Sequence, residues 1–237
     1  MKVDIIISAD HIKDEYLSNK VVVVIDMLRA TSVITTALAN GANRVIPLLT
    51  VEEALELAKQ NRKYYILGGE RKAVKIEDFD LSNSPLDYSS ELVSGKDVIL
   101  TTTNGTRAIN ACHKAKRIFI GSMLNGKAIV EKLQDLNEDV VFVNAGTVGQ
   151  FSMDDFICAG YMINCLMEHS KVQLSDIAFT AKYIYENNSN IIDYIKNASH
   201  FNILKSLNLH DDIDYCMQKD VFYIVPEYRN GEIVNAV

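Results

Sequence analysis

Short apolar runs alternate with segments of helical periodicity through residues 20–142. The run VVVVID at 21–26 is apolar along nearly its whole length rather than at every second position. Runs of that kind indicate strands covered on both faces. The pattern predicts an α/β fold of three layers, a mainly parallel sheet flanked by helices. The expected strands are 21–26, 44–48, 64–67, 97–100, 117–120 and 139–143, and the expected helices are 31–40, 51–60 and those that begin near Asn104, Asn125 and Ser152.

The rhythm changes after about Ser170, where closely spaced helical segments predict a helix-rich C-terminal part. With three prolines in the chain and no Gly/Ser-rich run, no flexible linker can be placed. We therefore expect residues 1–237 to form a single compact unit; two lobes are an alternative, but the sequence marks no boundary between them. The expected helices here are 176–187, 190–197, 199–206 and 210–217, followed by strands at 221–225 and 232–237.

The chain carries 24 Lys and Arg against 31 Asp and Glu, a formal charge of −7. This acidic balance argues against a nucleic-acid partner. No apolar stretch approaches the roughly 20 residues of a membrane span, and the N-terminus lacks a signal-peptide pattern. We expect a cytoplasmic protein without a membrane partner, and a homodimer on base rates. The four cysteines form no C-x-x-C pair, which favours buried thiols over a zinc or redox site.

Charged and hydroxyl residues follow the first expected strand, in the segment IDMLRATS at 25–32. Ligands in open α/β sheets bind beyond the carboxyl ends of strands, where helices begin. Asp26 ends the strand, and Arg29 follows it with a guanidinium suited to phosphate or sulfonate. Thr31 and Ser32 are candidate helix caps and ligands. The alternative is that Asp26 and Arg29 pair with each other and Thr31 only caps the helix.

Two further segments carry charge or hydrogen-bonding groups at expected strand ends or turns. In the sequence GGER, Glu70 and Arg71 follow a turn made by two glycines; the alternative is a surface turn with a solvated ion pair. The turn F-D-L-S-N-S-P places Asn83 and Ser84 before a proline, and we expect it to form a wall of the same cleft.

The segment TTTNGTRA at 101–108 combines hydroxyls, a turn into a helix and Arg107. These groups together predict an anion cradle, whereas a simple helix cap would need one Thr. The segment is neither a Walker A loop nor a G-x-G-x-x-G turn. The candidate ligands are Thr102, Thr103, Asn104, Gly105 and Thr106.

The fourth strand end lies in NAGTVGQFSMDDFICAG at 144–160, where Gly146 shapes a loop and Asp154 and Asp155 fall in a first helical turn. Acidic residues there often only complement the helix dipole. Two carboxylates at the same sheet edge as Asp26 and Glu70 are also suited to Mg²⁺, which prefers oxygen ligands. The histidines form no zinc motif and no G-x-S-x-G elbow is present, which disfavours zinc and serine hydrolases.

Six segments, in this order, resemble the 2-phosphosulfolactate phosphatase family, and the resemblance runs through nearly the whole chain. Asn144 and Val148 depart from the cysteine and the charged residue expected of the family at these places. The matching segments are D-x-L-R-A-T-S at 26–32, G-E-R at 69–71, F-D-L-x-N-S-P at 79–85, T-T-T-N-G-T-R-A at 101–108, A-G-T-x-G at 145–149 and D-D-x-x-C-A-G at 154–160, with a similar tail from Ser199.

The resemblance implies Mg²⁺-dependent hydrolysis of 2-phospho-3-sulfolactate, a small polyanionic substrate, to 3-sulfolactate and phosphate. A phosphatase for another small phosphorylated acid and a non-catalytic sensor of such an acid are the alternatives. The roles implied are catalysis by Asp26, Arg29, Glu70, Arg107 and Asp154, metal binding by Asp26, Glu70, Asp154 and Asp155, and substrate binding by Thr31, Ser32, Arg71, Asn83, Ser84, Thr102, Thr103, Asn104, Gly105, Thr106 and Gly146.

Overall fold

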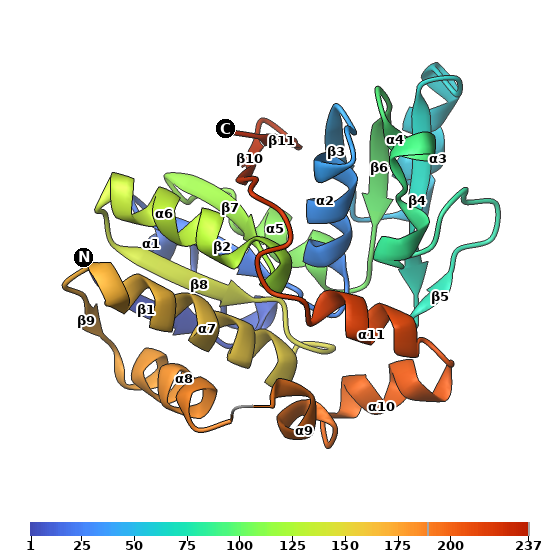
Figure 1. Ribbon diagram of the computed structural model, residues 1–237. Helices are drawn as coiled ribbons and strands as arrows, with labels where there is room; N and C mark the ends of the chain where they lie inside the picture. Colours follow the sequence, from blue (N-terminus) through green and yellow to red (C-terminus); the bar gives the residue numbers. More distant parts are fainter. Residues whose placement is uncertain (189, 237) are drawn as a thin grey trace.

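The computed structural model describes residues 1–188 and 190–236 and has one mixed sheet between helical layers (Figure 1). The strand order is β5-β4-β6-β3-β11-β10-β7-β2-β8-β1-β9. The strands are β1 (Lys2–Ile6), β2 (Val21–Ile25), β3 (Arg44–Pro47), β4 (Tyr65–Arg71), β5 (Val74–Lys75), β6 (Asp97–Thr101), β7 (Arg117–Gly121), β8 (Val140–Asn144), β9 (Gln173–Leu174), β10 (Pro226–Arg229) and β11 (Glu232–Asn235).

The helices lie close to their expected positions, and the C-terminal part is helical as predicted. No helix in the described part of the chain is long and apolar enough to cross a bilayer. The α-helices are α1 (Asp14–Leu17), α2 (Ala30–Ala39), α3 (Val51–Gln60), α4 (Ser90–Val93), α5 (Gly105–Ala111), α6 (Gly126–Leu136), α7 (Met153–His169), α8 (Asp176–Glu186), α9 (Ile191–Ile195), α10 (Ser199–Ser206) and α11 (His210–Cys216), and the 3₁₀ helices are η1 (Ala9–His11), η2 (Pro85–Asp87) and η3 (Met123–Asn125).

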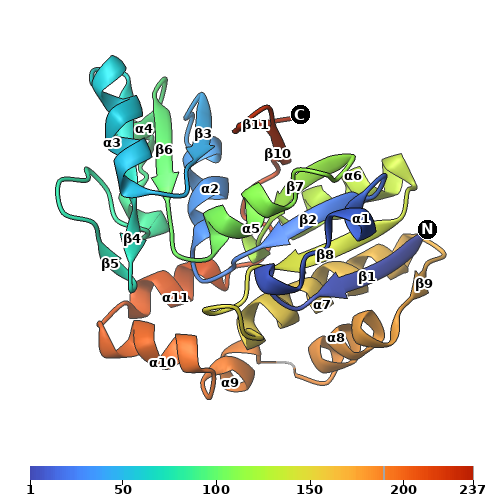
Figure 2. The ribbon, with the colours of Figure 1, turned by 180° about the vertical axis from the view of Figure 1, so that it is seen from behind.

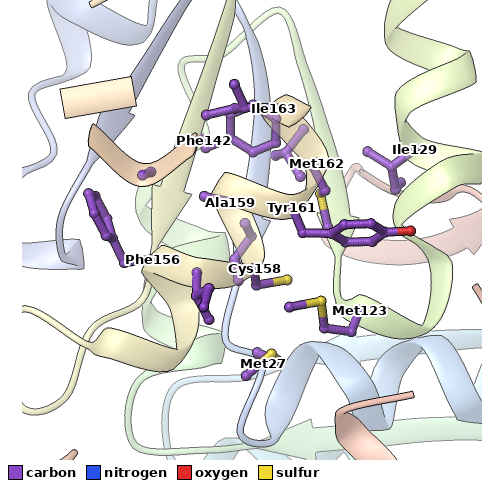
Figure 3. Packing of buried hydrophobic residues seen from close by; sticks show 14 of the residues in the cluster. Met27, Met123, Ile129, Phe142, Phe156, Cys158, Ala159, Tyr161, Met162 and Ile163 are labelled. Carbon is purple, nitrogen blue, oxygen red and sulfur yellow. The ribbon is translucent and has the colours of Figure 1, made fainter. Parts of the chain in front are cut away.

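The strand β2 shows why the chain folds in three layers, because all five of its residues are buried. Val23 belongs to a core that also contains side chains of α6 and α7, and Figure 3 shows part of that core around Phe142 and Met162. Val24 belongs to a second core, formed with α2 and α5. Burial of a Val, Ile or Phe side chain contributes about 1.5–3 kcal/mol. This packing fixes β2 in the centre of the sheet and confirms the predicted fold class.

The sheet consists of two parallel halves that run in opposite directions. β1, β2, β7 and β8 form one half, and β3, β4 and β6 form the other. The β10–β11 hairpin joins them through three antiparallel pairings, of β7 with β10, β10 with β11 and β11 with β3. The arrowheads of β2 and β8 and those of β4 and β6 all point toward the part of the molecule near α11 (Figures 1 and 2). The prediction of one common sheet edge was therefore wrong: two edges converge.

Two expectations at the ends of the chain differ from the structure. Residues 221–225 are not a strand, because the N–H of Phe222 donates to the carbonyl oxygen of Leu124 at 2.9 Å rather than to a neighbouring strand. The hairpin begins at Pro226 instead and turns at Asn230 and Gly231, both at positive φ, which is the geometry that Asn-Gly turns favour. The first strand, β1, was not predicted; it pairs in parallel with β8.

Candidate active site

Asp26 lies directly after β2, and 8% of its surface is exposed. Its Oδ1 accepts a hydrogen bond from the N–H of Ala30 at 3.3 Å, at the start of α2. Its Oδ2 faces Gly105, where an added Cβ would lie 2.7 Å from this oxygen and 2.5 Å from the Ala30 Cβ. Glycine is required at this position because the start of α5 packs directly against Asp26 and α2.

The start of α5 is held by the segment 101–106. Thr102 and Thr106 bond reciprocally: the N–H of Thr106 donates to the Thr102 hydroxyl at 3.1 Å, and the N–H of Thr102 donates to the Thr106 hydroxyl at 3.2 Å. Asn104 Oδ1 accepts from the N–H of Val148 at 3.1 Å, in the loop after β8. Both bonds fix the backbone of the loop that faces Asp26.

Glu70 joins this loop to the end of β4 and is buried. Its Oε1 accepts from the N–H of Thr103 at 2.6 Å and its Oε2 from the N–H of Ala73 at 2.7 Å. The alternative of a solvated ion pair with Arg71 is therefore wrong. Arg71 instead donates to the Thr101 hydroxyl at 2.9 Å.

Asp154 and Asp155 are adjacent and buried but differ in their partners. Asp155 accepts from the N–H of Met27 at 2.9 Å and from the N–H of Gly146 at 3.0 Å, so it ties the loop after β2 to the loop after β8. Burial and the nearby Asp154 and Asp26 raise its pKa well above the ordinary value. Asp154 accepts one bond, from the hydroxyl of Ser152.

Burial and like charges raise the pKa of Asp26 to about 6. Asp154 and Glu70 add to the effect, whereas His200 and the N–H of Ala30 lower the pKa. Asp26, Glu70 and Asp154 therefore share one electrostatic neighbourhood.

The four predicted metal ligands are not equally available to a cation. Glu70 and Asp155 accept backbone bonds on both oxygens. Within residues 1–188 and 190–236, Asp26 and Asp154 each keep one oxygen that no protein group donates to. No three acidic, His or Cys residues of this part of the chain are grouped closely enough to form a metal cage. Mg²⁺ needs only one or two carboxylates beside water and phosphate oxygens, so Asp26 and Asp154 fit such an ion.

Arg29 is almost fully buried and pairs with Asp212 of α11, not with Asp26 as the alternative held. Its Nη1 donates to Asp212 Oδ2 at 2.5 Å, and its Nη2 donates to the carbonyl oxygen of Ala73 at 3.0 Å. The hydroxyl of Ser84 donates to the other oxygen of Asp212 at 2.5 Å. Ser84 and Arg29 thus meet on a residue that the sequence analysis did not select.

The other predicted ligands occupy several places. Arg107 is half exposed at the rim, where it pairs with Asp10. Thr31 accepts from the N–H of Asp26 at 3.1 Å, and the Ser32 hydroxyl donates to the carbonyl oxygen of Met27 at 2.8 Å. Asn83 is buried, and among the described residues its Oδ1 has no hydrogen-bond partner.

His200 of α10 is a second site residue that the sequence analysis did not select. Its Nε2–H donates to the carbonyl oxygen of Leu28 at 2.7 Å, in the loop after β2. It also lines a cleft of about 440 Å³ that contains Asp154. The tail motif from Ser199 was the one signal that pointed to this part of the chain. A larger cavity of about 710 Å³ lies elsewhere, between the start of β7 and the β10–β11 hairpin.

Comparison with known proteins places this arrangement in a family. The family model described as 2-phosphosulpholactate phosphatase matches residues 6–231. The chain belongs to that family, and its class is that of the phosphoric monoester hydrolases.

Curated relatives agree over nearly their whole length, and each is named a probable 2-phosphosulfolactate phosphatase. The relative from Clostridium beijerinckii is 58% identical over 98% of this chain and 99% of its own. The relative from Clostridium acetobutylicum is 57% identical over 99% of this chain and 100% of its own. The relative from Clostridium tetani is 58% identical over 98% of this chain and 100% of its own.

Proposed function

We propose that the protein hydrolyses 2-phospho-3-sulfolactate to 3-sulfolactate and inorganic phosphate, with Mg²⁺ required. The observation that carries the proposal is the pair of buried carboxylates, Asp26 and Asp154, each with an open oxygen beside the start of α5. The family and the printed names of the relatives support the substrate. The cytoplasmic location and the homodimer stay predictions.

Asp26 and Asp154 would hold the Mg²⁺ ion, which supplies charge neutralisation at the phosphoryl oxygens. The crowding of acidic groups that raises the pKa of Asp26 supports this assignment, because a cation at the same place would favour the ionised carboxylates. Glu70 and Asp155 would act by holding the loops on which the two ligands and the substrate depend.

The substrate phosphate would lie between these carboxylates and the 102–106 loop. That loop is already fixed by the Thr102–Thr106 bonds and by Glu70, so its N–H groups need no rearrangement to stabilise a developing negative charge. Arg29 would contribute positive charge from the loop after β2, oriented by Asp212.

We favour direct attack by water over an aspartyl-phosphate intermediate. The oxygen of water bonds to phosphorus, the bond between phosphorus and the C2 oxygen breaks, and the leaving alkoxide takes up a proton. The covalent route is typical of a D-x-D-x-[TV] sequence, whereas Asp26 is followed by Met27 and Leu28.

The test is phosphate release from 2-phospho-3-sulfolactate by the purified protein, with Mg²⁺ and with a chelator. We expect Mg²⁺-dependent release that Asp26→Asn lowers at least about 1,000-fold, because electrostatic contributions to phosphoryl transfer are of that order. Asp135→Asn, an exposed substitution on α6, is the matched control and should retain full activity. Absence of Mg²⁺-dependent release by the wild type would refute the proposal.

A further inference from the structure

A polar cleft adjoins the reaction centre and is built from two segments that are distant in the chain. One wall is residues 147–154, which lead from β8 into α7, and the other is residues 197–200 at the start of α10. Figure 1 shows α9 and α10 beside the end of α7 at which this helix begins. The cleft has a volume of about 440 Å³, ample for a three-carbon acid.

The side chains that line this cleft are mainly hydrogen-bond donors. Among the described residues, the side chains of Gln150, Asn197 and Ser199 have no protein partner, so each is available to a bound molecule. Phe151 and Met153 add apolar surface that can pack on a methylene group. Hydroxyl, amide and imidazole donors match the three acceptor oxygens of a sulfonate.

His200 links this cleft to the loop that carries Asp26. Its Nε2–H is committed to the carbonyl oxygen of Leu28 at 2.7 Å, which fixes the ring. The second nitrogen, Nδ1, has no partner within residues 1–188 and 190–236 and can donate to an anion when the ring is protonated. Asp154 lines the same cleft, so a molecule held here lies next to the proposed metal ligands.

We propose that this cleft is the subsite for the sulfonate end of the substrate, with His200 as its cationic ligand and Asn197 and Ser199 as its neutral ones. The inference rests on the proposed function, because it divides the same substrate between two places. The phosphate lies at Asp26 and the 102–106 loop, and the sulfonate lies between α7 and α10. His200 therefore determines specificity for sulfonated over plain 2-phospho acids.

The experiment compares ligands with and without the sulfonate. Calorimetry measures binding of 3-sulfolactate and of lactate, and steady-state assays measure KM for 2-phospho-3-sulfolactate and for 2-phospholactate. The variants are His200→Gln, whose amide can still donate to Leu28, and Ser199→Ala, which leaves that bond intact. His169→Gln, at the exposed far end of α7, is the matched control.

We expect His200→Gln to weaken 3-sulfolactate binding and to raise KM for the sulfonated substrate about tenfold, as loss of one charge-assisted hydrogen bond would. Ser199→Ala should weaken binding about threefold. The KM for 2-phospholactate should change less than twofold in both variants, and the control should behave as the wild type. Melting temperatures show whether each variant is folded, and Ser199→Ala decides the matter if His200→Gln is not.

Three results would overturn the subsite: no binding of 3-sulfolactate by the wild type, unchanged affinity in the folded variants, or an equal loss with both substrates. Failure of the proposed function looks different. In that case the wild type would release no phosphate from either substrate, while the loss of 3-sulfolactate affinity in the variants would still support the subsite.

Discussion

The two halves of the sheet both bring carboxylates to the site, but they leave them in different states. Asp26 after β2 and Asp154 after β8 each keep an open oxygen in the described structure. Glu70 at the end of β4 accepts a backbone N–H on each oxygen. A carboxylate whose oxygens accept backbone bonds holds a loop in place, whereas one with an open oxygen is available to a ligand. We assign the chemistry to the β2–β8 half and its framework to the β4–β6 half.

The largest effect is expected where the two halves touch. Gly105→Ala would place a Cβ 2.5 Å from that of Ala30 and 2.7 Å from Asp26 Oδ2, so α5 must move away from Asp26. Activity should fall about 100-fold, because misplacement by about 1 Å has that order of effect. Steady-state assays and melting curves test this. Activity within twofold of the wild type would show that the contact does not position the site.

Glu70→Gln tests whether the β4–β6 half is framework. The amide nitrogen cannot accept from a backbone N–H, so one bond to Thr103 or Ala73 is lost and that donor is left buried. We expect a loss of about 1–3 kcal/mol in the free energy of unfolding and about a tenfold loss of kcat. Urea unfolding and kinetics measure both. A full loss of activity without any loss of stability would place Glu70 among the reacting groups instead.

Stability should depend on pH through Asp26. Its folded-state pKa of about 6 lies above the ordinary 3.8, so the folded protein binds the proton more tightly. Its contribution therefore lowers the free energy of unfolding as pH rises from about 4 to about 6, and the full cost remains above that range. Without divalent cations, Asp26→Asn should stabilise the protein by about 1–3 kcal/mol at pH 8.

That gain should shrink toward zero near pH 4, where the wild-type carboxyl is protonated in both states. Urea unfolding of both proteins with a chelator, at several pH values, measures the difference. The same difference at every pH would contradict the assigned cause.

The smallest effect is expected at Arg107, which was predicted to be catalytic. It is half exposed and pairs with Asp10 at the rim. Arg107→Ala should change kcat/KM less than about threefold, whereas Arg29→Ala should lower it at least about tenfold, because Arg29 is buried beside the loop after β2. Kinetics of the two variants decide between them, and the reverse order would restore the prediction for Arg107.

The sequence predicted those parts of the molecule that depend on local pattern. The apolar run at 21–26 predicted β2 and placed Asp26 at its end, and the three threonines predicted the loop before α5. The convergence of the two sheet halves was not predictable, because it depends on one hairpin that reverses the strand direction.

Partners that lie far apart in the sequence were also missed. Asp212 is 183 residues from Arg29, and His200 is 172 residues from Leu28. No local spacing reports such contacts, since they form when α10 and α11 pack beside the loop after β2. For the same reason the pairing of Arg107 with Asp10, at a separation of 97 residues, could not be seen.

The most direct measurement is a Mg²⁺ titration of phosphate release from 2-phospho-3-sulfolactate by the wild type, Asp154→Asn and Glu70→Gln. If open oxygens separate ligands from framework, Asp154→Asn should raise the Mg²⁺ concentration for half-maximal activity at least about tenfold, whereas Glu70→Gln should lower the maximum and leave that concentration within about twofold. A shift in Glu70→Gln with none in Asp154→Asn would contradict the account.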